Sequence, residues 1–146
     1  MRRTAFLKTC GLGCLGIIGT PFLLESCAGV KYLNGTLRDS FLEIQLNTFE
    51  IVKKDRTTFR KYVIVQNSAL QYPICVYRIS PTEFQALLMK CTHQGTELQV
   101  YGDRLQCPAH GSEFTKNGAV QNGPADQTLR KFPVQINQNI LRIDLT

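Results

Sequence analysis

Two short cysteine-histidine pairs constrain this chain more than any other feature of its sequence. Cys91 is followed closely by His93, and Cys107 is followed closely by His110, with residues 94–106 between the pairs. The pairs contain both histidines of the 146-residue chain and two of its six cysteines. Thiolate and imidazole ligands suit soft or borderline metals, so four such ligands predict either a zinc site or an iron-sulfur cluster.

The spacing within each pair favours the cluster. One cysteine and one histidine lie two or three residues apart in each pair, so two facing loops can each supply one thiolate and one imidazole. A 2Fe-2S centre with two cysteines on one iron and two histidines on the other has this ligand set. Zinc motifs more often pair cysteine with cysteine and histidine with histidine. On the ligands alone, a structural zinc module stays the alternative.

The residues around the pairs resemble the two cluster-binding boxes of the Rieske iron-sulfur family. The boxes are residues 91–95, Cys-Thr-His-Gln-Gly, and residues 107–112, Cys-Pro-Ala-His-Gly-Ser, and the similarity extends over about residues 62–145. The resemblance implies one 2Fe-2S cluster, with an inner iron bound by the cysteines and an outer iron bound by the histidines. We therefore expect buried cysteines and histidines near the surface. The predicted ligands are Cys91, His93, Cys107 and His110.

Five further residues are predicted to surround the cluster. Gly95 and Gly111 allow a positive φ and let backbone amides point at sulfides, unless they are ordinary loop glycines. By resemblance, Ser112 donates a hydrogen bond to a cluster sulfur, whereas Phe114 stands where quinol-oxidising members carry a tyrosine hydroxyl. Pro124 is expected either to rigidify a loop that covers the cluster or to mark a turn.

The chain departs from the quinol-oxidising members in a second way. Those members carry an extra cysteine at each box, and the two form a disulfide between the cluster loops. Thr96 and Ala109 occupy these places here. Fewer hydrogen bonds to the cluster predict a reduction potential below that of the quinol oxidisers, within the family span of roughly −150 to +300 mV.

The N-terminal residues predict export. Arg2 and Arg3 precede an apolar run over about residues 10–24, which has the layout of an export signal and is short for a transmembrane helix. The paired arginines resemble a twin-arginine signal, with one residue more than usual before Phe6. The residues before Cys27 resemble a lipobox, so we expect residues 1–26 to be the signal and Cys27 to carry lipid. This places the protein at the periplasmic or outer face of a bacterial membrane. An uncleaved anchor and a freely soluble product are the alternatives.

The rest of the chain predicts an all-β fold. Short apolar or alternating segments separated by turn residues indicate strands at residues 41–46, 62–65, 74–79 and 84–88, followed by a hairpin over residues 132–145. We expect a small antiparallel β-sandwich or barrel over residues 41–146, with a cluster-binding subdomain made of two loops. The segment 27–40 has no clear periodicity and is predicted to be a tether. The basic run at residues 53–61 is interpreted as a solvated loop rather than a face for anionic lipid or an acidic partner.

These features predict an electron-transfer component rather than a self-sufficient enzyme. The cluster uses both histidines, so none is left for the mononuclear iron of a Rieske oxygenase or for a hydrolytic triad. We expect a membrane-tethered carrier, or the small subunit of a periplasmic or respiratory oxidoreductase, that acts with a redox partner protein or membrane complex. A quinol-oxidising subunit of a cytochrome bc-like complex is the alternative. A formal charge of +6 without a basic aromatic platform gives no sign of nucleic-acid binding.

Overall fold

The computed structural model describes residues 29–146, so the predicted export signal and Cys27 lie outside the described part. Short strands dominate this part, and its one helical element is the 3-10 helix η1, Leu46–Phe49. None of the described residues forms a helix with the length and hydropathy that crossing a membrane requires. The prediction of an all-β fold is confirmed.

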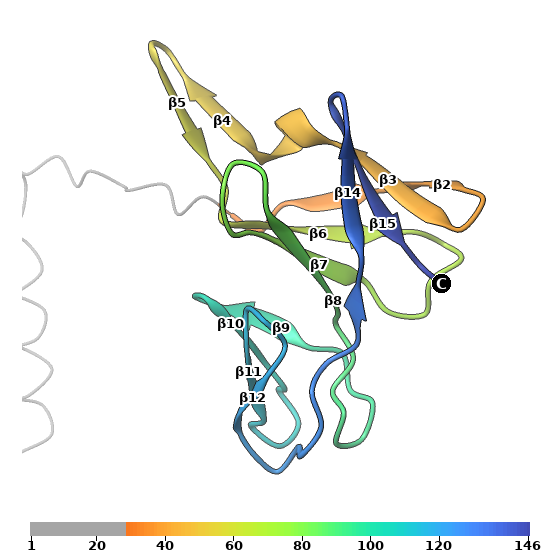
Figure 1. The fold of residues 1–146 in the computed structure, drawn as a ribbon. Coiled ribbons are helices and arrows are strands. Elements are labelled where there is room, and N and C mark those ends of the chain that lie inside the picture. Colours follow the sequence, from red (N-terminus) through yellow and green to blue (C-terminus); the bar gives the residue numbers. More distant parts are fainter. Residues whose placement is uncertain (1–28) are drawn as a thin grey trace, which may run out of the picture.

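Two sheets form the larger part of the molecule (Figure 1). The first has the order β1-β6-β7-β8-β13, with β1 Tyr32–Asn34, β6 Tyr62–Gln66, β7 Ile74–Arg78, β8 Phe84–Leu88 and β13 Lys131–Phe132. The second has the order β14-β15-β3-β2, with β2 Thr36–Arg38, β3 Phe41–Gln45, β14 Val134–Asn137 and β15 Ile140–Asp144. Neighbouring strands in both sheets are antiparallel except β1 and β6, which run parallel.

Residues 32–38 belong to these sheets and do not form the tether that the sequence suggests. In β1, Tyr32 pairs with Ile64 of β6, and in β2, Leu37 pairs with Leu42 of β3. All three residues of β2 are exposed, so no hydrophobic alternation marks it in the sequence. The folded domain therefore includes residues before 41.

The five-stranded sheet is buried on both faces, which explains the apolar runs Val63–Val65, Ile74–Tyr77 and Ala86–Leu88 in its central strands. In β7, Ile74 and Val76 lie in one core, whereas Cys75 and Tyr77 lie in another. Side chains alternate along a strand, so a strand covered on both sides needs apolar residues at every position.

The two cores differ in the elements that complete them. The sandwich core lies between the two large sheets and consists of Leu42, Ile44, Phe49, Val63, Val65, Ile74, Val76, Ala86, Phe132, Leu141 and Ile143. The loop core lies on the other face of the five-stranded sheet and consists of Ile64, Cys75, Tyr77, Leu87, Met89, Cys91, Leu98, Leu105, Cys107, Phe114, Ala125 and Leu129. Two of the predicted cluster ligands, Cys91 and Cys107, therefore belong to the loop core.

Two smaller sheets complete the described part. The order of the first is β12-β11-β10-β9, with β9 Gln99–Tyr101, β10 Arg104–Gln106, β11 Glu113–Thr115 and β12 Val120–Asn122. The second is a hairpin of β4, Glu50–Lys53, and β5, Arg56–Phe59, so the basic run expected as a loop is in fact largely strand. Figure 1 shows this hairpin projecting at the end of the molecule opposite the loops that connect β8 to β9 and β10 to β11.

Candidate metal centre

The two cysteine-containing loops close with the same backbone hydrogen bonds. In the loop between β8 and β9, the Cys91 N–H donates to the Thr96 carbonyl at 2.8 Å, and the Gly95 N–H donates to the Cys91 carbonyl at 2.8 Å. In the loop between β10 and β11, the equivalent bonds run from Cys107 to Ser112 at 2.8 Å and from Gly111 to Cys107 at 3.0 Å. Although the histidine follows at a different spacing, both loops present the cysteine in the same backbone frame.

Each of these frames turns at a glycine with positive φ. The φ angle is 77° at Gly95 and 75° at Gly111, so both glycines have the positive φ that the sequence predicts. A Cβ added at Gly111 would meet no atom within 4 Å, so backbone conformation rather than crowding favours glycine there. At Gly95 the added Cβ would also lie 3.3 Å from a side-chain carbon of Lys90.

The four predicted ligands are arranged with sulfur inside and imidazole outside. Cys91 is 1% exposed and Cys107 is 2% exposed, whereas His93 and His110 are both exposed. The two imidazole rings face each other edge to face, with centroids 5.0 Å apart and an angle of 88° between their planes. The expectation of deep cysteines and superficial histidines is therefore confirmed.

The surroundings of Cys107 favour its thiolate. Burial is the largest single influence and acts to raise the pKa of this thiol, but the hydrogen bonds that it receives together lower the pKa below its ordinary value, those from the backbone N–H groups of His110 and Ala109 foremost. The side chains of Cys91 and Thr96 act in the same direction. Thiolate is the form in which cysteine binds metals, so this loop is prepared for a cation next to the sulfur.

A third loop, between β12 and β13, holds the two cysteine-containing loops in place. The Thr92 hydroxyl donates to the Gln127 carbonyl at 2.8 Å, and the Ala125 N–H donates to the Ser112 hydroxyl oxygen at 3.0 Å. Ser112 is fully buried, and because its oxygen accepts this bond, its own hydrogen remains available for a further acceptor. Pro124 is an exposed member of this third loop.

The predicted departures from the quinol-oxidising pattern occupy different environments. Phe114 is fully buried in the loop core, where its ring offers no hydrogen-bond donor. Ala109 is exposed, and Thr96 is half-buried beside Cys107. All three cysteines of the described residues are free thiols.

The donor set fits a 2Fe-2S cluster with two cysteine and two histidine ligands. Two buried thiols offer sulfur to one metal, and two adjacent exposed imidazoles offer nitrogen to a second. Among residues 29–146, no three Cys, His, Asp or Glu side chains gather closely enough to hold a single metal ion. The separation of two buried thiols from two exposed imidazoles matches the two irons of such a cluster, whereas a structural zinc site places all four ligands around one ion.

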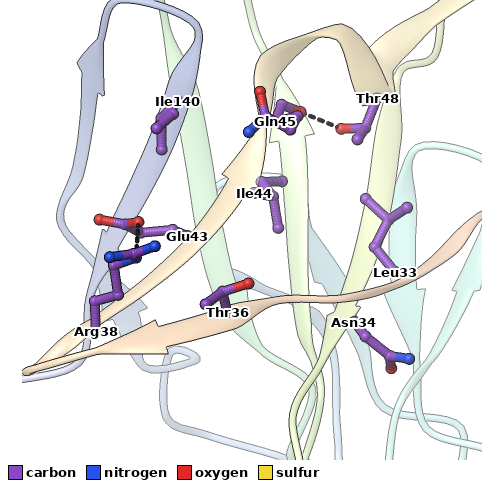
Figure 2. A pocket seen from close by; sticks show the side chains of 9 residues that line it. All are labelled: Leu33, Asn34, Thr36, Arg38, Glu43, Ile44, Gln45, Thr48 and Ile140. Atoms are coloured by element: carbon purple, nitrogen blue, oxygen red, sulfur yellow. Dashed lines mark hydrogen bonds and ion pairs between the residues drawn. The ribbon is translucent and has the colours of Figure 1, made fainter.

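A separate cavity of about 260 Å³ lies among β1, β2, β3 and η1 and contains none of the predicted site residues (Figure 2). Its one carboxylate, Glu43, lies 3.3 Å from Nε of Arg38 and accepts a hydrogen bond from Nε of Arg142 at 2.9 Å. Two arginines thus neutralise this carboxylate, and the cavity offers no cluster of reactive groups. The four predicted ligands lie elsewhere, on the two cysteine-containing loops.

Known proteins share part of this sequence. A family model described as the Rieske 2Fe-2S domain matches residues 49–133. The "cytochrome b6-f complex iron-sulfur subunit 2" of Nostoc sp. (strain PCC 7120) is 32% identical over 59 residues, which cover 39% of this chain and 33% of that protein. The protein of the same name from Trichormus variabilis gives the same values. The chain thus spans about a third of the length of the curated relatives it matches.

Solved structures share the fold. The cyanobacterial plasma membrane Rieske protein PetC3 from Synechocystis PCC 6803 superposes with a TM-score of 0.50 at 24% identity, covering 57% of this chain and 86% of that one. A naphthalene 1,2-dioxygenase with indole bound superposes with a TM-score of 0.55 at 18% identity, covering 73% of this chain and 26% of that one. At these identities the two likenesses describe the fold alone.

Proposed function

We propose, from the premise that the chain belongs to the Rieske 2Fe-2S domain family and carries one 2Fe-2S cluster for electron transfer, that four residues of its two loops bind that cluster. Cys91 and Cys107 are the ligands of one iron, and His93 and His110 are the ligands of the other. The observation that carries this proposal is the combination of two exposed imidazoles, whose ring centroids lie 5.0 Å apart, with two buried thiols.

When bound, the cluster supplies a one-electron redox couple. The loop core shields the sulfur side from water, because Phe114 and Leu105 are fully buried beside the cysteines. The exposed imidazoles of His93 and His110 form the side that a redox partner approaches. Ser112 has a hydroxyl hydrogen to donate toward the cluster, and such a donor stabilises the more negative, reduced state.

At the level of the whole protein, we propose an exported and membrane-tethered electron carrier, or the small subunit of a periplasmic or respiratory oxidoreductase. The N-terminal arginines, the apolar run and the lipobox-like residues before Cys27 support export and lipid attachment. Mass spectrometry of the protein from membranes tests this. A mature chain that begins at a lipid-modified Cys27 is expected, and an intact Met1 would contradict cleavage.

A second candidate is a quinol-oxidising subunit of a cytochrome bc-like complex. The two relatives named as cytochrome b6-f iron-sulfur subunits favour it. The phenylalanine at 114, and threonine and alanine where the disulfide cysteines would stand, argue against it. A redox titration separates the two, because a potential at the top of the span of roughly −150 to +300 mV would support the quinol oxidiser.

The ligand proposal is tested on the purified full chain. Two irons and two sulfides per chain, with the visible and EPR spectra of a Rieske cluster, are expected. One zinc per chain without colour would refute it. Affinity purification from solubilised membranes should then recover the redox partner, and reduction of the cluster by that partner would establish the direction of electron flow.

A further inference from the structure

The β4–β5 hairpin is exposed and amphipathic: its strand register places the apolar Val52 and Phe59 on one face and the basic Lys53 and Arg56 on the other. Residues 50–61 contain five cationic side chains against the two acidic ones of Glu50 and Asp55. Val52 is 68% exposed and Phe59 is 48% exposed, although both are large apolar side chains. A solvated charge run does not need exposed apolar residues among its cations, so this composition indicates a binding surface. The cations are Lys53, Lys54, Arg56, Arg60 and Lys61.

At its base, the hairpin meets the first described residues of the chain around a cationic cavity. This cavity of about 240 Å³ has three cationic side chains and no acidic one in its lining. Nη1 of Arg60 donates to the Glu50 carbonyl at 2.7 Å, but the buried Nε of Arg60 has no hydrogen-bond partner among residues 29–146. Because its lining has three cations and no acidic side chain, an anion is the ligand that this cavity suits. The lining residues are Gly29, Val30, Lys31, Ile51, Phe59, Arg60, Lys61 and Tyr62.

The position of this cavity along the chain points to the kind of anion. Gly29 and Val30, which line it, follow directly after the N-terminal segment whose sequence predicts membrane attachment. The membrane tether proposed above, on which this inference rests, would place the cavity and the hairpin where the chain leaves a bilayer. An element with exposed apolar side chains on one face and cations on the other has the arrangement of amphipathic segments that bind anionic membrane interfaces.

We propose that residues 29–31 and 50–61, the hairpin surface, bind the phosphate headgroups of an anionic bilayer, with Val52 and Phe59 at the boundary of the acyl chains. Arg60 and Lys61 bind a headgroup in the cavity, and Lys53 and Lys54 add attraction from the strand and turn. The loops with His93 and His110 lie at the opposite end of the molecule (Figure 1), so docking turns them away from the membrane. The redox partner then reaches the cluster from the aqueous side.

A single tryptophan tests this docking, because the chain contains none of its own. The full-length, cluster-loaded chain with Val52→Trp is reconstituted into phosphatidylcholine vesicles that contain phosphatidylglycerol and brominated acyl chains, and bromine quenching of the tryptophan is measured. Tyr101→Trp is the positional control, because Tyr101 is 64% exposed on β9 and lies outside the hairpin surface. The visible spectrum of each sample reports on the cluster separately, so loss of the cluster cannot be mistaken for loss of docking.

We expect stronger quenching at position 52 than at position 101 with anionic vesicles, and loss of the difference with pure phosphatidylcholine or high salt. Lys53→Gln with Lys54→Gln should lower the ratio of docked to undocked protein by roughly 30-fold, because each cation near an anionic surface contributes roughly fivefold. The matched pair Lys116→Gln with Lys131→Gln, two exposed lysines elsewhere, should leave the ratio unchanged. Equal quenching at both positions, or quenching insensitive to lipid charge and to the hairpin lysines, would overturn the proposal. Equal quenching would leave an acidic protein as the partner of this surface.

Discussion

The two faces of the five-stranded sheet show how one structural layer separates stability from chemistry. On one face, the sandwich core is built only from aliphatic and aromatic side chains of strands and η1. On the other face, the loop core contains Cys91 and Cys107 and lies against the fully buried Ser112. Both cores use the same strands, β6, β7 and β8, in alternate positions.

This difference indicates that the sheet acts as a rigid support for the loops. The sandwich core can fix the sheet without any metal, because its members need only be apolar and well packed. The loop core places polar and sulfur-containing groups against that support, where the backbone bonds of the two loops hold them in position. Function is thus placed on loops and stability on the sheets beneath them.

The largest expected effect comes from removing a ligand on the functional face. His93→Ala or His110→Ala should abolish the Rieske EPR signal, because the outer iron loses half of its protein ligands. Circular dichroism and hydrogen exchange of β3 and β15 should still report a folded sandwich core. Gln94→Ala, at an exposed residue next to His93, is the matched control and should keep the full signal. A His93→Ala protein with unchanged iron content and EPR spectrum would refute the ligand assignment.

The next largest effect comes from creating a cavity in each core and comparing the loss of stability with the loss of the cluster. Leu141 in the sandwich core and Leu105 in the loop core are both fully buried. Replacing either by alanine should lower the free energy of unfolding by about 2–5 kcal/mol, because each change leaves a cavity. Only Leu105→Ala should also speed the loss of visible absorbance when a chelator is added. Equal cluster lability in the two variants would show that the faces are not independent.

A smaller effect on the free energy of unfolding is expected from pH, and it comes from Cys75 on the loop-core face of the sheet. Burial raises the pKa of the Cys75 thiol to about 12, although the nearby Tyr77 hydroxyl opposes the shift. The unfolded chain releases this proton near its ordinary pKa of about 9, whereas the folded chain keeps it. The stability contribution is therefore complete below about pH 9 and is lost as pH rises toward about 12, with a limiting slope of about 1.4 kcal/mol per pH unit.

Chemical denaturation between pH 8 and about pH 11 measures that slope. Cys75→Ala should remove the part of the slope that comes from this thiol. Ile74→Val, one residue earlier but in the sandwich core, should change the stability without changing the slope. An identical slope in Cys75→Ala and the unchanged protein would show that the thiol is not a source of the pH dependence.

The sequence predicts the buried strands well and the exposed ones poorly. The expected strands at 62–65, 74–79 and 84–88 correspond to β6, β7 and β8, because burial on two faces requires continuous apolar runs. The strands β2 and β5 were missed, since every residue in them is exposed and leaves no periodic signal. Their pairing is decided by backbone bonds, which residue type does not reveal.

The same contrast holds at the candidate site. Ligand chemistry restricts which residues can bind a metal, so the cysteine-histidine pairs are visible in the sequence. The links from Thr92 to Gln127 and from Ser112 to Ala125 were not predicted, because each joins a side chain to a backbone atom of a distant loop. Almost any residue could supply that backbone atom, and only the folded chain identifies it.

The smallest expected effect is a shift in reduction potential from Phe114→Tyr. Phe114 is fully buried in the loop core, so an added hydroxyl gains its partner inside the protein or remains unsatisfied. If the hydroxyl donates to the cluster, one hydrogen bond of about 1 kcal/mol should raise the potential by about 40 mV in a redox titration. Phe114→Leu is the control, because it alters packing without adding a donor and should not raise the potential. A lower or unchanged potential in Phe114→Tyr would mean that the ring does not point at the cluster. The potential would then have to be explained by Ser112 and the backbone amides of the two loops.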